Sequence, residues 1–127
     1  MTISVIRLGS PRGKAEGLRL GTVRRPPRGV RKENYGKGNY YDLWLPDLAP
    51  SAKLIARARK DWAGFVKAYR REMSQPAAQR LLGLLAQLSQ QADFSVGCYC
   101  EREEGCHRSV LRQLLAEHGA KLTKGEA

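Results

Sequence analysis

The chain has 127 residues, with 23 lysines and arginines against 12 acidic residues, so its formal net charge is +11. This length is sufficient for one domain with a single buried core. A hydrophobic fraction of 42% excludes a wholly disordered polyelectrolyte, and without a run of about 18 apolar residues the sequence offers no transmembrane helix. We expect a cytoplasmic protein with no membrane partner, because the N-terminal residues lack the pattern of a signal peptide.

Three short segments in the first part of the chain have the character of strands. Residues 3–8 (ISVIRL) form an apolar run that ends at a Gly-Ser-Pro turn, and residues 18–23 (LRLGTV) are a second segment of strand length. Residues 40–45 (YYDLWL) are rich in aromatic side chains and stop at Pro46. They predict either a third short strand or an extended loop.

Helical periodicity replaces the strand pattern after Pro50, and the first helix is expected over residues 51–60. Asp61 is predicted to cap the next helix, and a third helix begins at Ser74 and Pro76. Apolar residues recur at helical spacing in both of these helices and are expected to form their buried faces. The expected buried residues are Trp62, Phe65, Val66, Tyr69 and Met73 in the first case, and Ala78, Leu81, Leu82, Leu85 and Leu88 in the second.

The C-terminal part returns to a strand and then to a helix. Residues 93–99 (DFSVGCY) have strand character, and a helix is expected from Cys106 to His118, ended by Gly119. Residues 120–127 are expected to form a flexible tail. This order predicts one α/β domain over residues 1–127, with a mixed, mostly parallel sheet flanked by helices, because a long helical crossover favours parallel pairing. The buried residues of the last helix are expected to be Val110, Leu111, Leu114 and Leu115.

Most of the charge excess lies in residues 1–38, which carry ten cations and two anions. The basic part of this segment, residues 19–37, is punctuated by Gly and Pro, and tyrosines lie at its far end. Arginines suit phosphate recognition because the guanidinium fork matches phosphate oxygens, and tyrosines can stack on a base. A solvated surface loop is the alternative interpretation.

All three cysteines lie within nine residues, between the last predicted strand and the last predicted helix. Ligands of open α/β sheets bind beyond the carboxyl ends of strands, beside helix N-termini that favour anions. Gly105 is expected to let the backbone approach such a ligand closely. His107 and Arg108 fall in the first helical turn, where cations are unfavourable unless an anion joins them. Alternatively, the protein itself can supply the negative charge that balances His107 and Arg108. The candidates are Glu101, Glu103 and Glu104.

The cysteines allow three kinds of chemistry. Cys106, at a helix N-terminus, is a candidate nucleophile, and Cys98 is a second candidate thiol. No metal ligands are assigned, because the spacing C-x-C-x5-C-H departs from the two-residue spacers of structural zinc sites, and a redox or metal sensor is the third alternative function. A disulfide of Cys106 with Cys98 or Cys100 is easier than one between Cys98 and Cys100, but an odd cysteine count without an export signal favours reduced thiols. A buried apolar role is the alternative for each cysteine.

Four motifs together resemble a known family. Residues 25–33 (RPPRGVRKE) are similar to a W-P-R-G-V-x-K-E segment, residues 43–51 (LWLPDLAPS) to W-x-x-x-L-A-P-S, and residues 62–73 to W-x-x-F-x-x-x-Y-x-x-E-L. Cys98 or Cys100 with Glu101, followed by C-H-R from Cys106, resembles a C-x-E…C-H-R pattern, although Glu101 directly follows Cys100. On these motifs the chain resembles the domain-of-unknown-function 488 family, in its YeaO-like branch. The resemblance implies a compact α/β domain and no established activity.

We therefore expect a protein that binds an anionic small molecule or a nucleotide at the loop from Cys98 to Arg108, and we assign no reaction and no cofactor to it. The alternative is a nucleic-acid-binding module that uses residues 19–37, although the sequence contains no known nucleic-acid-binding motif. The candidates for catalysis are Cys106, Cys98 and His107. The expected ligand-binding residues are Arg24, Arg25, Arg28, Lys32, Gly105 and Arg108.

Overall fold

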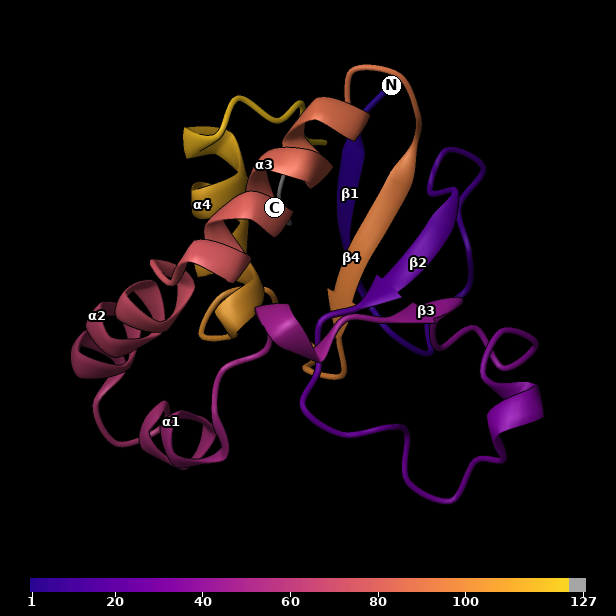
Figure 1. The fold of residues 1–127 in the computed structure, drawn as a ribbon. Helices are drawn as coiled ribbons and strands as arrows, with labels where there is room; N and C mark the ends of the chain where they lie inside the picture. Colours follow the sequence, from indigo (N-terminus) through magenta and orange to yellow (C-terminus); the bar gives the residue numbers. More distant parts are fainter. Residues whose placement is uncertain (124–127) are drawn as a thin grey trace.

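The computed structural model describes residues 1–123 and arranges four strands in one parallel sheet, in the order β1–β4–β2–β3 (Figure 1). The strand β4 lies between β1 and β2, so that Phe94 is aligned with both Ile3 and Leu18. An α/β fold with a mostly parallel sheet is thus confirmed. The third strand has two residues instead of the six in the segment 40–45, because the chain bends at Asp42, immediately before the strand begins. The strands are Ile3–Arg7 (β1), Leu18–Gly21 (β2), Leu43–Trp44 (β3) and Phe94–Cys98 (β4).

Four α-helices lie on the left of the view in Figure 1, and the long connection between β2 and β3 extends to its lower right. The predicted cap of α2 is confirmed, because the Asp61 carboxylate accepts a hydrogen bond from the Gly64 N–H at 3.0 Å. Gly119, with φ of 87°, follows the end of α4 in the left-handed conformation typical of a helix stop. The helices are Ala52–Arg57 (α1), Trp62–Met73 (α2), Pro76–Leu88 (α3) and His107–Glu117 (α4), and short 3-10 turns cover Lys32–Asn34 and Pro46–Leu48.

The main core lies between the helices and one face of the sheet. The predicted buried face of α4 is confirmed at all four positions, and α2 buries its aromatic residues Phe65 and Tyr69. The prediction for α3 is wrong at Leu88, which is 44% exposed, whereas Ala86 is buried. Successive residues of an α-helix are rotated by about 100° around its axis. Leu88 is therefore turned roughly 100° away from the centre of the buried face of α3, which explains its exposure. The strand residues in this core are Ile3, Val5, Leu20, Phe94 and Val96.

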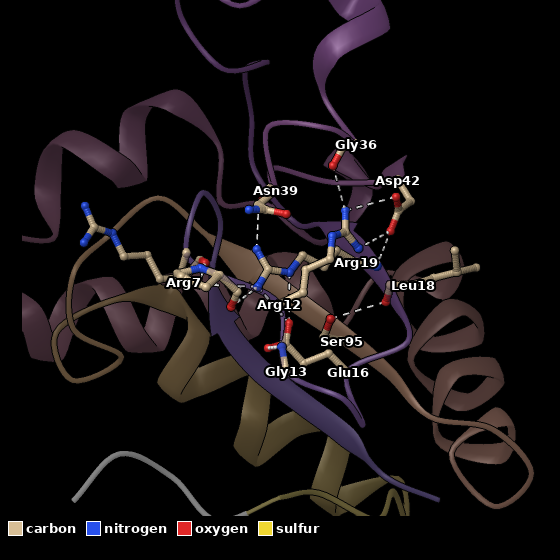
Figure 2. A network of polar contacts seen from close by, with 12 residues as sticks. Arg7, Arg12, Gly13, Glu16, Leu18, Arg19, Gly36, Asn39, Asp42 and Ser95 are labelled. Carbon is tan, nitrogen blue, oxygen red and sulfur yellow. Dashed lines mark hydrogen bonds and ion pairs between the residues drawn. The ribbon is translucent and has the colours of Figure 1, made fainter.

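The opposite face of the sheet is polar, and the loops cover it. Ser4, Arg19 and Ser95 are buried there, and Arg19 is completely inaccessible to solvent. Figure 2 shows the Arg19 guanidinium enclosed by loop residues, where its Nε donates to Glu16 at 2.9 Å and its Nη1 to the carbonyl oxygen of Asn39 at 2.5 Å. Arg19 is therefore a structural cation, and it is not available to a ligand or to a nucleic acid.

Residues 121–123 run beside β1. The Ile3 N–H donates to the carbonyl oxygen of Lys121 at 2.8 Å, and the Thr123 N–H donates to the carbonyl oxygen of Ile3 at 3.0 Å. The rest of the predicted tail, residues 124–127, lies outside the described residues. Within residues 1–123, none of the helices has the length and the apolar character needed to cross a membrane.

Candidate functional site

The carboxyl ends of β1, β2 and β4 meet at one edge of the sheet, next to the first turn of α4. Two backbone hydrogen bonds join the strands at this edge: the Thr22 N–H donates to the carbonyl oxygen of Gly97 at 3.0 Å, and the Leu8 N–H donates to that of Cys98 at 2.8 Å. The loop that leaves β4 therefore starts beside the end of β2. This is the place where open α/β sheets bind their ligands.

The three cysteine sulfurs lie within 4.8 Å of one another at this edge. Cys98 ends β4 and Cys106 precedes α4, and both are buried, whereas Cys100 is exposed on the loop between them. The Sγ atoms of Cys98 and Cys100 are 3.8 Å apart. A disulfide bond is about 2.0 Å long, so these are free thiols.

Ionisation of the cluster is favoured at the exposed sulfur. Hydrogen bonds with Cys106 and Cys98 lower the pKa of the Cys100 thiol far below its usual value, and the positive charges of Arg108 and Arg59 act in the same direction. For Cys98, hydrogen bonds with the other two cysteines raise the pKa, and burial adds to this effect. Loss of a proton is therefore easier at the exposed Cys100 than at the buried Cys98.

His107 connects the end of β2 to the start of α4. Its Nε2 lies 2.7 Å from the carbonyl oxygen of Thr22, and because a carbonyl can only accept, Nε2 must carry a proton. The other ring nitrogen, Nδ1, lies 3.8 Å from the Sγ of Cys106. Although a hydrogen bond with Cys100 opposes the shift, the contacts of Cys106 with Cys98 and His107 lower the pKa of the Cys106 thiol. The ring is thus held in the orientation that faces the cluster.

Arg108 is a buried cation with unused hydrogen-bond donors. Its residue exposure is 0%, its Nη2 donates to the carbonyl oxygen of Cys100 at 2.9 Å, and its Nε and Nη1 have no partner among the described residues. Glu103, one of the three expected internal counter-charges, pairs with Arg112 through contacts of 2.5 and 3.0 Å. A buried guanidinium with unpaired N–H groups is costly, so this position favours an anionic group close to it.

Gly105 serves the backbone conformation of the loop. Its φ is +74°, in the left-handed region, and a Cβ at this position would meet no atom within 4 Å. The left-handed conformation by itself accounts for a glycine here, and the expected close approach of the backbone to a ligand stays a prediction. The turn that it allows brings the Cys106 N–H to the carbonyl oxygen of Glu103 at 3.0 Å and so sets the start of α4.

The candidate residues of the basic loop have different positions. Arg24 donates to the carbonyl oxygens of Pro50 and Ala49 at 3.2 and 3.1 Å, which holds the loop against the segment before α1. Lys32 is exposed in a 3-10 turn and is not part of the cavity described next. Arg25 and Arg28 line a cavity of about 540 Å³, together with Pro26, Pro27, Tyr40 and Tyr99.

Tyr99 joins this cavity to the cysteine loop. It lies in the sequence between Cys98 and Cys100, its hydroxyl donates to the carbonyl oxygen of Arg25 at 2.9 Å, and its ring contacts that of Tyr40 edge-on at 6.5 Å. The basic loop and the cysteine loop therefore meet at a shared wall. The sequence alone could not place them together, since 74 residues separate Tyr99 from Arg25.

Several residues of the site had not been expected from the sequence. Thr22 and Tyr99 lie at the carboxyl ends of two segments that were expected to be strands, and nothing in the sequence marked either of them as a site residue. Arg59 lies in the turn between α1 and α2, and its charge acts on Cys100 from a segment without any local motif. Such residues are found only from the packing of the helices.

Comparison with known proteins identifies one family. The family model DUF488-N3a, described as the active DUF488-N3 subclade, matches residues 3–119. This range includes the sheet, all four helices and the cysteine loop. The match is to the N3 subclade, and the YeaO-like branch stays a prediction. No curated protein and no solved structure matches the chain.

Proposed function

The chain belongs to the DUF488 family, and we propose that it binds an anionic, phosphate-bearing small molecule in the cavity beside the cysteine loop. The observation that carries this proposal is the shared wall at Tyr99, through which the cavity with Arg25 and Arg28 adjoins the loop that holds Arg108. Arg25 and Arg28 are the guanidinium groups offered to the ligand. The expected binding residue Arg108, in contrast, is completely buried, lies outside the cavity lining and supports the adjoining loop through the carbonyl oxygen of Cys100.

The lining of the cavity suits a nucleotide. Guanidinium groups bind phosphate oxygens through paired N–H donors, and Arg25 and Arg28 supply two such groups. The rings of Tyr40 and Tyr99 and the adjacent prolines offer an apolar wall against which a base can pack. A volume of about 540 Å³ lies within the usual range of small-molecule sites.

The other predicted residues support this site in different ways. Arg24 fixes the basic loop, Gly105 shapes the turn before α4, and Lys32 remains outside the binding site. Cys100 is the sulfur of the cluster that is exposed to reagents in solution, because Cys98 and Cys106 are buried at 8% and 3% exposure. The cytoplasm is the proposed location, since three free thiols persist in a reducing compartment.

Calorimetric titration with inorganic phosphate, sulfate and adenosine monophosphate tests the proposal. We expect the nucleotide to bind with sub-millimolar affinity, and Arg25→Ala or Arg28→Ala to weaken its binding about tenfold or more, as expected for loss of a charge-assisted contact. Arg31→Ala is the matched control, because it removes the same charge from the same loop outside the cavity lining. Absence of binding, or an equal effect of all three variants, contradicts the proposal.

A nucleic-acid-binding module predicts a different result in the same variants. Contacts along a phosphate backbone release counterions, so that affinity for a 20-base DNA duplex falls steeply with salt. All three arginine variants would then weaken binding to a similar extent. Fluorescence anisotropy at two salt concentrations distinguishes the two functions. Binding of a small anion in the cavity depends on where each arginine lies in the loop, whereas binding of a nucleic acid depends mainly on the total charge.

A further inference from the structure

We propose that Cys98, Cys100 and Cys106 form a binding site for one zinc ion. This site goes beyond the proposed function, because the metal needs no anionic ligand in the cavity. The three sulfurs lie within 4.8 Å of one another, and each can supply one ligand atom. The geometry points to a metal although the spacing of the cysteines in the sequence does not.

The separation of the sulfurs fits a tetrahedral ion. With zinc–sulfur bonds of about 2.3 Å, two thiolates of a tetrahedral site are about 3.8 Å apart. The Sγ atoms of Cys98 and Cys100 are 3.8 Å apart. This distance is too long for a disulfide, and in this structure it is spanned by an S–H···S hydrogen bond, so that zinc can replace the shared proton with little movement of the sulfurs.

The backbone holds the three sulfurs in place from several directions. The carbonyl oxygen of Cys98 accepts from Leu8, which fixes the end of β4, and that of Cys100 accepts from the Arg108 guanidinium. Cys106 is fixed on both sides, because its N–H donates to Glu103 and its carbonyl oxygen accepts from the Ser109 N–H at 3.0 Å. A preformed donor set of this kind lowers the cost of ordering the ligands around an ion.

The charge of the surroundings supplies a second, independent observation. Three thiolates and one divalent zinc ion carry a net charge of −1. Arg108 is a completely buried cation next to Cys100, and its Nε and Nη1 have no partner among the described residues. A negatively charged metal–thiolate centre compensates this guanidinium and offers sulfur acceptors to its N–H groups.

The donor set suits a soft or borderline metal such as zinc and leaves one coordination position open. Three soft thiolates favour zinc over magnesium or calcium, which prefer oxygen ligands. His107 is not part of the group that the three sulfurs form, and its unprotonated Nδ1 lies 3.8 Å from the Sγ of Cys106, next to the proposed ion. Zinc with three protein ligands takes water or a substrate atom as its fourth ligand, which is the arrangement of catalytic zinc sites.

Cobalt titration of the reduced, chelator-treated full chain tests the site. We expect a sulfur-to-cobalt charge-transfer band that saturates at one ion per chain and disappears when an equivalent of zinc is added, because zinc binds such sites more tightly than cobalt. Zinc-loaded protein should also lose the reaction of Cys100 with iodoacetamide. A cobalt spectrum without a charge-transfer band would overturn the proposal.

Two variants make the result specific. Cys100→Ser alters an exposed position, so the fold is retained, and we expect at least about 100-fold weaker zinc binding. Arg28→Ala changes the cavity and should bind zinc as the parent does. Equal zinc affinity of Cys100→Ser and the parent contradicts the metal site. Zinc binding without any nucleotide binding contradicts only the proposed function, so the two failures are distinguishable.

Discussion

His107 donates a hydrogen bond from Nε2 to the carbonyl oxygen of Thr22 at 2.7 Å, and this contact ties the first turn of α4 to the end of β2. Both residues are buried, at 7% and 0% exposure. The contact spans 85 residues of sequence, and it closes the edge of the sheet at which the cysteine loop begins. A single side chain thus holds together two of the elements that form the site.

Loss of this contact should destabilise the protein. We expect His107→Leu to lower the free energy of unfolding by about 1–3 kcal/mol, because it leaves the buried Thr22 carbonyl without its side-chain donor. Urea unfolding measures the change. The matched control is His118→Leu, at the half-exposed end of α4, which should change the unfolding midpoint little. Equal midpoints of His107→Leu and the parent contradict the role given to this contact.

Arg19 is the second structural residue whose removal has a predictable effect. Arg19→Met should cost about 3–5 kcal/mol, because it leaves Glu16 and several loop carbonyls without their buried cation. The same substitution at the exposed Arg31 should change stability by less than about 0.5 kcal/mol. Denaturant unfolding of both variants tests this difference. Similar losses at both positions contradict the assignment of Arg19 as the buried cation of the loop-covered face.

Arg19 also marks the limit of prediction from the sequence. Periodicity identified the helices α2, α3 and α4 and the strand β4, because each has its own local pattern of apolar residues. The role of a cation depends instead on what covers it. Arg19 and Arg25 both belong to the basic segment 19–37, yet one is enclosed by loops and the other lines a cavity. The grouping of the three sulfurs has the same origin, since it follows from the turn at Gly105 and not from the spacing of the cysteines.

Asp42 should make the stability of the protein depend on pH in acid. Although partial burial opposes the shift, hydrogen bonds from the Arg12 guanidinium and the Arg19 backbone N–H hold the pKa of this carboxyl below its usual value. A carboxylate whose pKa is lowered by folding stabilises the protein at every pH above its pKa in the unfolded chain, which is near 3.9 in model peptides. This stabilisation is lost as the pH falls through the pKa that the carboxylate has in the folded protein.

The measurement compares the parent with Asp42→Asn. We expect the variant to be less stable by about 1–2 kcal/mol between about pH 5 and pH 7, where the parent carboxylate is fully ionised. The two unfolding midpoints should approach each other below about pH 4, as the parent carboxylate takes up its proton. Thermal unfolding across this range gives both curves. A difference that stays constant down to about pH 2 would rule out this carboxylate as the titrating group.

Two buried tyrosines should respond in opposite directions to loss of their hydroxyl groups. The Tyr69 hydroxyl donates to the carbonyl oxygen of Leu48 at 2.7 Å, whereas the Tyr41 hydroxyl is buried and has no partner among the described residues. Tyr69→Phe should therefore lower the free energy of unfolding by about 1–2 kcal/mol, because it breaks a buried hydrogen bond. Tyr41→Phe should leave stability unchanged or raise it by about 1 kcal/mol, since it removes an unsatisfied polar group. Urea unfolding of both variants, which differ from the parent by one oxygen atom each, tests the pair, and a loss at Tyr41 equal to that at Tyr69 contradicts the assignment of an unpaired hydroxyl.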